Sequence, residues 1–101
     1  MSDKVLTLTD IRRAVKPLAE KYHIGEVYLF GSYAKGTATE RSDVDLLVST
    51  DVSGLKFYGL AERLREALKK NIDLINVEQL SDNMDLLNEI MKEGIRIYVQ
   101  G

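Results

Sequence analysis

The residues of this chain best suited to chemistry are three aspartates. Asp43 and Asp45 flank a single valine at the start of an apolar run, and Asp73 lies inside a later apolar run, in NIDLINV. Alternate side chains of a β-strand point to the same side, so Asp43 and Asp45 are expected to share one face. Two carboxylates that are buried together without a cation force at least one of them to take up a proton. A divalent ion removes this conflict, so the pattern predicts a site for Mg²⁺, which proteins hold with one or two carboxylates plus substrate phosphates.

A Gly-Ser pair precedes the two neighbouring aspartates and directly follows an apolar run. Gly31 lets the backbone approach a phosphate, and the Ser32 hydroxyl with nearby N–H groups can hold it. Lys35 and Arg41 follow in the same segment, and their charges are suited to neutralising the outer phosphates of a triphosphate. Asp73 would complete a two-metal site or accept a proton from an attacking hydroxyl.

Each of these residues also has an ordinary structural explanation. A Gly-Ser pair after a strand is usually only a turn, an Asp-Val-Asp sequence is often an exposed edge, and Asp73 could face solvent at the rim of a sheet. Lys35 and Arg41 are by default solvated loop charges, and His23, the single histidine, is expected to serve a helix end or the surface. The order and spacing of these residues in combination, rather than any one of them, favour a catalytic site.

The segments that must position these residues alternate between helices and strands. Runs of β-forming residues predict strands over residues 27–30, 44–48, 72–77 and 95–99. Helical spacing of apolar residues predicts helices over residues 9–23, 55–70 and 81–93. The alternation predicts an α/β (α+β) fold with a four-stranded sheet and helices packed against it, formed by one domain over residues 1–101.

The ends of the first and third predicted helices are marked by polar residues and a glycine. Thr9 and Ser81 are the predicted N-caps, and Gly94 ends the third helix. Pro17 removes a backbone donor and is expected to kink the first helix.

The second predicted helix has an apolar stripe and a basic end. The stripe is predicted to consist of Leu55, Tyr58, Ala61, Leu64 and Leu68. Lys69 and Lys70 suit the negative end of the helix dipole. Residues 33–42, rich in Gly, Thr, Ser and charges, are predicted to be a loop or a short helical turn.

The positions of the acids also suggest how the strands run. The Gly-Ser pair follows the first strand and Asp43 precedes the second, so a shared site requires these strands to be antiparallel. A helix joins the second and third strands, which favours a parallel crossover. A mixed sheet of this kind brings one set of residues to a single end: Gly31, Ser32, Asp43, Asp45 and Asp73.

The composition excludes several classes of protein. With 45% hydrophobic and 30% charged residues, the chain is expected to be globular rather than disordered. A net charge of −2 argues against a general nucleic-acid coat protein, and the lack of cysteine excludes disulfides and thiolate metal sites. No apolar run approaches the roughly 18–20 residues of a membrane span, and the N-terminus lacks the apolar core of a signal peptide. A cytoplasmic location without membrane contact is therefore the default expectation.

The segment FGSYAKGTATERSDVDLLV resembles the signature of the polymerase-beta-like nucleotidyltransferases, which is Gly-Ser, a spacer, and Asp-x-Asp in an apolar strand. More closely, the chain resembles the minimal nucleotidyltransferase (MNT) proteins, which are little more than the catalytic core. Ala34-Lys35-Gly36 matches the family's glycine after a basic residue, although many relatives carry arginine where Lys35 stands. Asp73 matches the family's third acid, and the ending IMKEGIRIYV is similar to the closing helix and strand of the group.

This resemblance implies the polymerase beta-like nucleotidyltransferase fold and an Mg²⁺-dependent transfer. A nucleoside triphosphate, expected to be ATP, would pass its nucleoside monophosphate to an acceptor hydroxyl and release pyrophosphate. Asp43, Asp45 and Asp73 would bind two Mg²⁺ ions, and Asp73 would also help to activate the hydroxyl. The resemblance assigns nucleotide binding to Gly31, Ser32, Lys35, Arg41 and Ser42.

The resemblance also implies a partner. MNT proteins are typically encoded beside a helical HEPN-domain protein, which is often a toxic ribonuclease, and several attach AMP to a tyrosine of that toxin. We therefore expect an antitoxin with a cognate HEPN toxin as partner, homo- or hetero-oligomers, and no direct nucleic-acid binding. Two alternatives stay open at this point. The chain could neutralise its partner by contact alone, or it could transfer to a small molecule such as an aminoglycoside, as relatives with an additional domain do.

Overall fold

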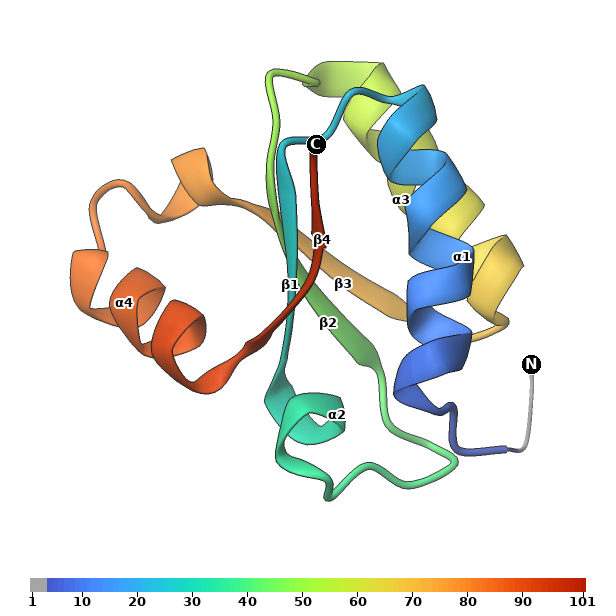
Figure 1. The fold of residues 1–101 in the computed structure, drawn as a ribbon. Coiled ribbons are helices and arrows are strands. Elements are labelled where there is room, and N and C mark those ends of the chain that lie inside the picture. The colour runs from blue at the N-terminus through green and yellow to red at the C-terminus, as the bar shows by residue number, and fades with distance from the viewer. Residues whose placement is uncertain (1–3) are drawn as a thin grey trace.

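A mixed four-stranded sheet forms the centre of the computed structural model, which describes residues 4–101. The strands lie in the order β3-β2-β1-β4 (Figure 1). Their bounds are Glu26–Phe30 for β1, Val44–Ser49 for β2, Ile72–Asn76 for β3 and Ile95–Val99 for β4. Strand β1 is antiparallel to β2 and β4, whereas β2 and β3 are parallel. The predicted α/β fold class and the predicted directions of the first three strands are confirmed.

Helices cover both faces of the sheet, but unequally (Figure 1). Helices α1 (Leu8–Lys21) and α3 (Gly54–Leu68) lie side by side on one face and bury the larger apolar core against it. Helix α4 (Met84–Glu93) lies on the other face, over a smaller core made by Leu47, Leu80, Leu87 and Ile90. Between residues 4 and 101, no helix is long and apolar enough to cross a bilayer.

Helix α1 begins earlier than predicted, because Thr7 and not Thr9 is its N-cap. The Thr7 hydroxyl accepts a hydrogen bond from the Asp10 N–H at 3.0 Å, and the Asp10 carboxylate accepts one from the Thr7 N–H at 2.9 Å. This reciprocal capping box satisfies two backbone donors, whereas Thr9 lies inside the helix. The helix continues through Pro17, which is exposed, to its end at Lys21.

The predicted apolar stripe of the second helix is wrong at its N-terminal end. In α3, Leu55 is 91% exposed and Tyr58 is 70% exposed, while Leu60 joins Leu64 and Leu68 in the core. At this end of the helix Phe57 packs against the core, in helical spacing with Leu60 and Leu64, so the buried side does not include Leu55 and Tyr58. The first turn of α3 therefore keeps apolar side chains in contact with solvent.

The third predicted helix also begins later than expected. A short 3-10 turn, η1 (Val77–Leu80), comes first, and Asn83 rather than Ser81 caps α4 by accepting a hydrogen bond from the Leu86 N–H at 3.2 Å. The end of the helix at Gly94 is as predicted. A Cβ at Gly94 would lie 2.5 Å from the Ile90 carbonyl oxygen, so the chain needs a glycine to turn here into β4.

Candidate active site

The three predicted catalytic acids lie at one end of the sheet. Asp45 in β2 is paired with Asp73 in β3, and Asp43 directly precedes β2. Because side chains alternate along a strand, Asp45 shares its face with Leu47, and Asp73 shares its face with Ile75. Leu47 and Ile75 pack beneath α4, so the two acids lie on the α4 face, beyond the part that this helix covers.

The Asp45 carboxylate lies close enough to Asp73 and Asp43 to be affected by their charges. Burial raises the pKa of Asp45, and the negative charges of Asp73 and Asp43 raise it further. Asp45 is half-buried, whereas Asp43 and Asp73 are exposed. Within residues 4–101, no three acidic or histidine side chains are already gathered as a metal-binding group. Mutual repulsion of carboxylates opposes such an arrangement until a cation compensates their charge.

Gly31 lies directly against Asp45. Strand pairing places Phe30 opposite Asp45, and the next residue, Gly31, has a φ of +69°. A Cβ at Gly31 would collide with the Asp45 carboxylate. A glycine is therefore required here for two reasons, the left-handed backbone and the close approach of the carboxylate. Ser32 follows in the short helix α2 (Gly31–Lys35) and is half-buried.

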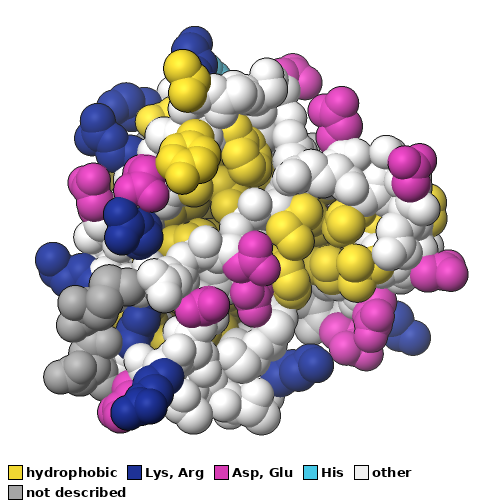
Figure 2. Space-filling model, turned by 180° about the vertical axis from the view of Figure 1, so that it is seen from behind, with side chains coloured by type: hydrophobic (Ala, Val, Ile, Leu, Met, Phe, Trp, Pro, Cys, Tyr) yellow, Lys and Arg dark blue, Asp and Glu magenta, His cyan; other side chains and the backbone are white. Residues whose placement is uncertain are grey.

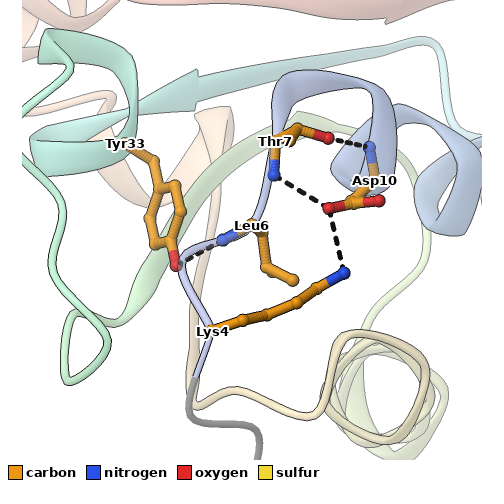
Figure 3. A network of polar contacts seen from close by, with 5 residues as sticks. All are labelled: Lys4, Leu6, Thr7, Asp10 and Tyr33. Atoms are coloured by element: carbon orange, nitrogen blue, oxygen red, sulfur yellow. Dashed lines mark hydrogen bonds and ion pairs between the residues drawn. The ribbon is translucent and has the colours of Figure 1, made fainter.

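Helix α2 is tied to the segment that leads into α1. The Tyr33 hydroxyl accepts a hydrogen bond from the Leu6 N–H at 3.3 Å (Figure 3). Beside this contact, Asp10 joins Thr7 in the capping box and lies 3.4 Å from the Lys4 ammonium group (Figure 3). This positioning role of Tyr33 was not predicted from the sequence, although the residue directly follows the Gly-Ser pair.

The other predicted nucleotide-binding residues lie at the end of α2 and in the following loop. Lys35 and Arg41 are exposed. Ser42 is instead engaged within the loop, where its hydroxyl accepts a hydrogen bond from the Thr39 N–H at 2.8 Å and its own N–H donates to the Thr39 carbonyl at 3.0 Å. Nucleotide binding by Lys35, Arg41 and Ser42 stays a prediction.

A cavity of about 220 Å³ opens between α2 and α4. Its lining residues are Phe30, Gly31, Ala34, Lys35, Ile75, Leu86, Glu89, Ile90, Glu93 and Gly94. Gly31 lines this cavity and also lies against Asp45, so the cavity is next to this acid. Figure 2 shows acidic side chains near the middle of this side of the molecule, next to hydrophobic side chains toward α4. The site therefore combines a cluster of negative charge around Asp45 with a largely apolar cavity beside it.

Comparison with known proteins identifies the class. The profile of the family described as "Polymerase beta, Nucleotidyltransferase" matches residues 13–100, which is most of the chain. The chain therefore belongs to the polymerase beta nucleotidyltransferase family, and it is a nucleotidyltransferase.

Individual relatives narrow the class to the minimal nucleotidyltransferases, as the resemblance predicted. The chain is 37% identical to the protein adenylyltransferase MntA of Thermococcus cleftensis, over 79% of this chain and 87% of that one. It is 30% identical to the MntA of Shewanella oneidensis, over 71% of this chain and 52% of that one.

Solved structures agree with this assignment. A structure provisionally described as a minimal nucleotidyltransferase superposes with a TM-score of 0.73 at 30% identity, over 89% of this chain and 95% of that one. A toxin-antitoxin structure with AMP-PNP superposes with a TM-score of 0.75 at 25% identity, over 88% and 73%.

Proposed function

We propose that this chain is an antitoxin that transfers AMP from ATP to a tyrosine hydroxyl of a cognate HEPN-domain toxin. The observation that carries this proposal is the placement of Asp43, Asp45 and Asp73 at one end of the sheet, where Asp45 lies against Gly31, which lines a largely apolar cavity. The names of the protein adenylyltransferase relatives support a protein acceptor, and the similar toxin-antitoxin structure with AMP-PNP supports an adenine nucleotide.

The acids fit Mg²⁺ by their chemistry. Carboxylate oxygens are the hard ligands that Mg²⁺ prefers, and burial, together with the negative charges of Asp73 and Asp43, already raises the pKa of Asp45. We assign Asp43, Asp45 and Asp73 as the residues that would hold two ions. Bound there, the ions would neutralise phosphate charge and stabilise the attacking and leaving oxygens.

The chain's own residues would align a displacement at the α-phosphorus of ATP. The acceptor oxygen forms a bond to this phosphorus while the bond to the bridging oxygen of the β-phosphate breaks, so pyrophosphate leaves. Asp73, which is exposed at the open end of the sheet, takes the proton of the acceptor hydroxyl. Gly31 and Ser32 approach the phosphates through their backbone and hydroxyl groups, and Lys35 and Arg41 balance the outer charges.

The cavity between α2 and α4 is suited to the nucleoside. Phe30 and Ile75 supply apolar surface for a flat ring, and Gly31 connects this surface to the acids that would face the phosphates. Ser42 would act indirectly, by shaping the loop through its bonds to Thr39.

Mass spectrometry of the partner tests the proposal directly. Incubation of the chain with ATP, Mg²⁺ and the HEPN protein encoded beside it should raise the mass of that protein by one or more AMP units. The double variant Asp43→Asn/Asp45→Asn should abolish the mass increase because it removes two metal-binding charges. Asp51→Asn is the matched control, since Asp51 is exposed and lines a separate cavity with His23. Continued transfer by the double variant would contradict the role of these acids.

Exposed apolar side chains favour a second candidate, neutralisation of the toxin by contact alone. Leu55 and Tyr58 on α3 are mostly exposed, and Met84, Leu86 and Met91 on α4 are each at least 38% exposed. Apolar residues that gather on a surface often mark a protein interface. Titration of toxin activity separates the two mechanisms. If the double Asn variant protects as well as the unmodified chain at equal dose, contact is sufficient and transfer is not the mechanism.

A further inference from the structure

Lys70 is a lysine in the protein interior. It is only 3% exposed, whereas its neighbour Lys69 is exposed. Burial of an ammonium group is strongly unfavourable unless hydrogen bonds compensate the lost water. The Lys70 ammonium group donates to the backbone carbonyl of Glu40 at 2.7 Å, across 30 positions of the sequence. This hydrogen bond therefore connects the buried charge to a distant point of the chain.

That point lies in the loop of residues 36–43, between α2 and β2. Glu40 is near its middle, Arg41 follows, and Asp43 is its last residue. The loop thus connects the Gly-Ser turn to strand β2. It carries Arg41, a proposed nucleotide-binding residue, and Asp43, a proposed metal ligand. A change in its path would move Arg41 and Asp43 directly.

The Lys70 contact also lies at the point where the pairing of β2 with β3 begins. Next to it, the Val44 N–H donates to the Asn71 carbonyl at 2.9 Å, and one residue further Asp45 is paired with Asp73. The loop therefore meets the start of β3 at Lys70 before the two strands take up their parallel register. Lys70 acts where the spacing between the acid-bearing strands is set.

Bonds inside the loop do not replace this contact. Thr39 receives a hydrogen bond from the Arg41 N–H at 3.3 Å and exchanges bonds with Ser42. These bonds fix the shape of the turn, but each joins two residues of the same loop. A contact to the rest of the fold is needed to fix the position of the turn, and Lys70 provides one.

We propose that Lys70 is a positioning residue for nucleotidyl transfer. Its buried ammonium group holds the loop so that Asp43 meets Asp45 and Asp73 in the geometry that the reaction needs. Because its side chain is buried, Lys70 acts through the loop and not by contact with the nucleotide. The effect on AMP transfer rests on the proposed function, whereas the effect on the loop does not.

Lys70→Met is the main test, because it keeps the aliphatic stem and removes the donor and the charge. Hydrogen exchange of the amides in residues 36–43, measured without nucleotide, should become roughly tenfold faster, as expected for loss of one hydrogen bond to a charged group. The kcat for AMP transfer should fall on the order of 10²-fold with little change in the KM for ATP, since misplaced catalytic groups slow the chemical step. Lys69→Met is the matched control and should leave all three quantities unchanged.

Two further variants keep the test decisive if Lys70→Met folds poorly. Lys70→Gln retains a neutral donor on a shorter stem and should give intermediate loop exchange and intermediate kcat. Lys70→Arg retains the charge and donors and should recover part of both. The proposal is overturned if loop exchange and kcat in both Lys70→Met and Lys70→Gln equal those of the unmodified chain. If Lys70→Met does not fold, equal values in Lys70→Gln alone overturn it. Absence of AMP transfer by the unmodified chain would contradict the proposed function instead, while loop exchange would still report on Lys70.

Discussion

The two faces of the sheet differ in how completely they are covered, and β2 contributes to both. On the face toward α1 and α3, Val44, Leu46 and Val48 are at most 2% exposed. On the other face, Leu47 is buried beneath α4, whereas Asp45 lies beyond that helix and is half-buried. The covered face is built for stability, while the partly open face keeps a crowded, charged group accessible. Strand β2 thus fixes the positions of Asp43 and Asp45, because burial of Val44, Leu46 and Val48 on one face leaves these two acids on the other.

Truncation of a core side chain on the covered face should have the largest effect on stability. Leu46→Ala removes a side chain that is 0% exposed and should lower the free energy of unfolding by about 3 kcal/mol. Leu86→Ala, at a residue of α4 that is 38% exposed, should cost less than about 1 kcal/mol. Chemical denaturation of both variants measures the difference. Equal losses would show that the buried Leu46 side chain contributes no more to stability than the partly exposed Leu86 side chain.

A methyl group at Gly31 should disturb the open face more than the same change a few residues away. Gly31→Ala and Gly36→Ala both place alanine at a positive φ, which costs roughly 1–2 kcal/mol in each case. Only at Gly31 does the new Cβ also collide with Asp45. At Gly36, among residues 4–101, no atom other than those of the glycine and its chain neighbours lies within 4 Å of the Cβ position. Gly31→Ala should therefore be the less stable variant and should also slow AMP transfer.

Comparison of melting temperatures and transfer rates of the two alanine variants isolates the collision. Truncation of the carboxylate in the double variant Gly31→Ala/Asp45→Ala should recover the stability lost to the collision, but not the activity. Identical melting temperatures for Gly31→Ala and Gly36→Ala would indicate that Asp45 can move aside freely.

The smallest expected effect is the pH dependence that Asp45 confers. Burial and the charges of Asp73 and Asp43 raise its pKa in the folded chain. The folded chain therefore holds this proton more tightly than the unfolded chain does. The resulting stabilisation is fully present below the ordinary aspartate pKa and is lost as the pH rises through the raised pKa.

Asp45→Asn removes the ionised form and should melt at a higher temperature than the unmodified chain at neutral pH in the absence of divalent ions. The difference should disappear in acid and should narrow when Mg²⁺ is added, since the ion would stabilise only the carboxylate form. Thermal melts at several pH values, with and without Mg²⁺, measure this. A lower melting temperature for Asp45→Asn at neutral pH would contradict the sign of the pKa shift.

Local patterns in the sequence predicted the strands and their directions well. The run from Val44 to Val48 is apolar with Asp45 as its one polar residue, and a helix between β2 and β3 restricts their connection to a parallel one. Predictions at helix ends were weaker, because several Thr, Ser and Asn residues competed as caps. Thr7 and Asn83 became caps only where their side chains reached backbone donors.

Other predictions failed because they concerned the surroundings of a residue. Leu55 and Tyr58 fit a helical stripe, but the buried side of α3 begins instead with Phe57, which packs against the core, and continues with Leu60. Lys70 was expected to suit the C-terminal end of a helix, but nothing in the sequence indicated that it is buried and that its ammonium group donates to the carbonyl of Glu40. A side chain's spacing along a helix does not reveal what lies opposite it in the fold.

The sequence by itself determined which residues can do chemistry and that Asp43, Asp45 and Asp73 belong to one end of a mixed sheet. It could do so because strand periodicity and the handedness of crossovers act over short stretches of chain. Only the tertiary structure decided that Asp45 lies against Gly31, that a cavity between α2 and α4 adjoins them, and that Lys70 holds Glu40. These contacts join segments that are distant in sequence, so their geometry follows from the packing of the whole chain.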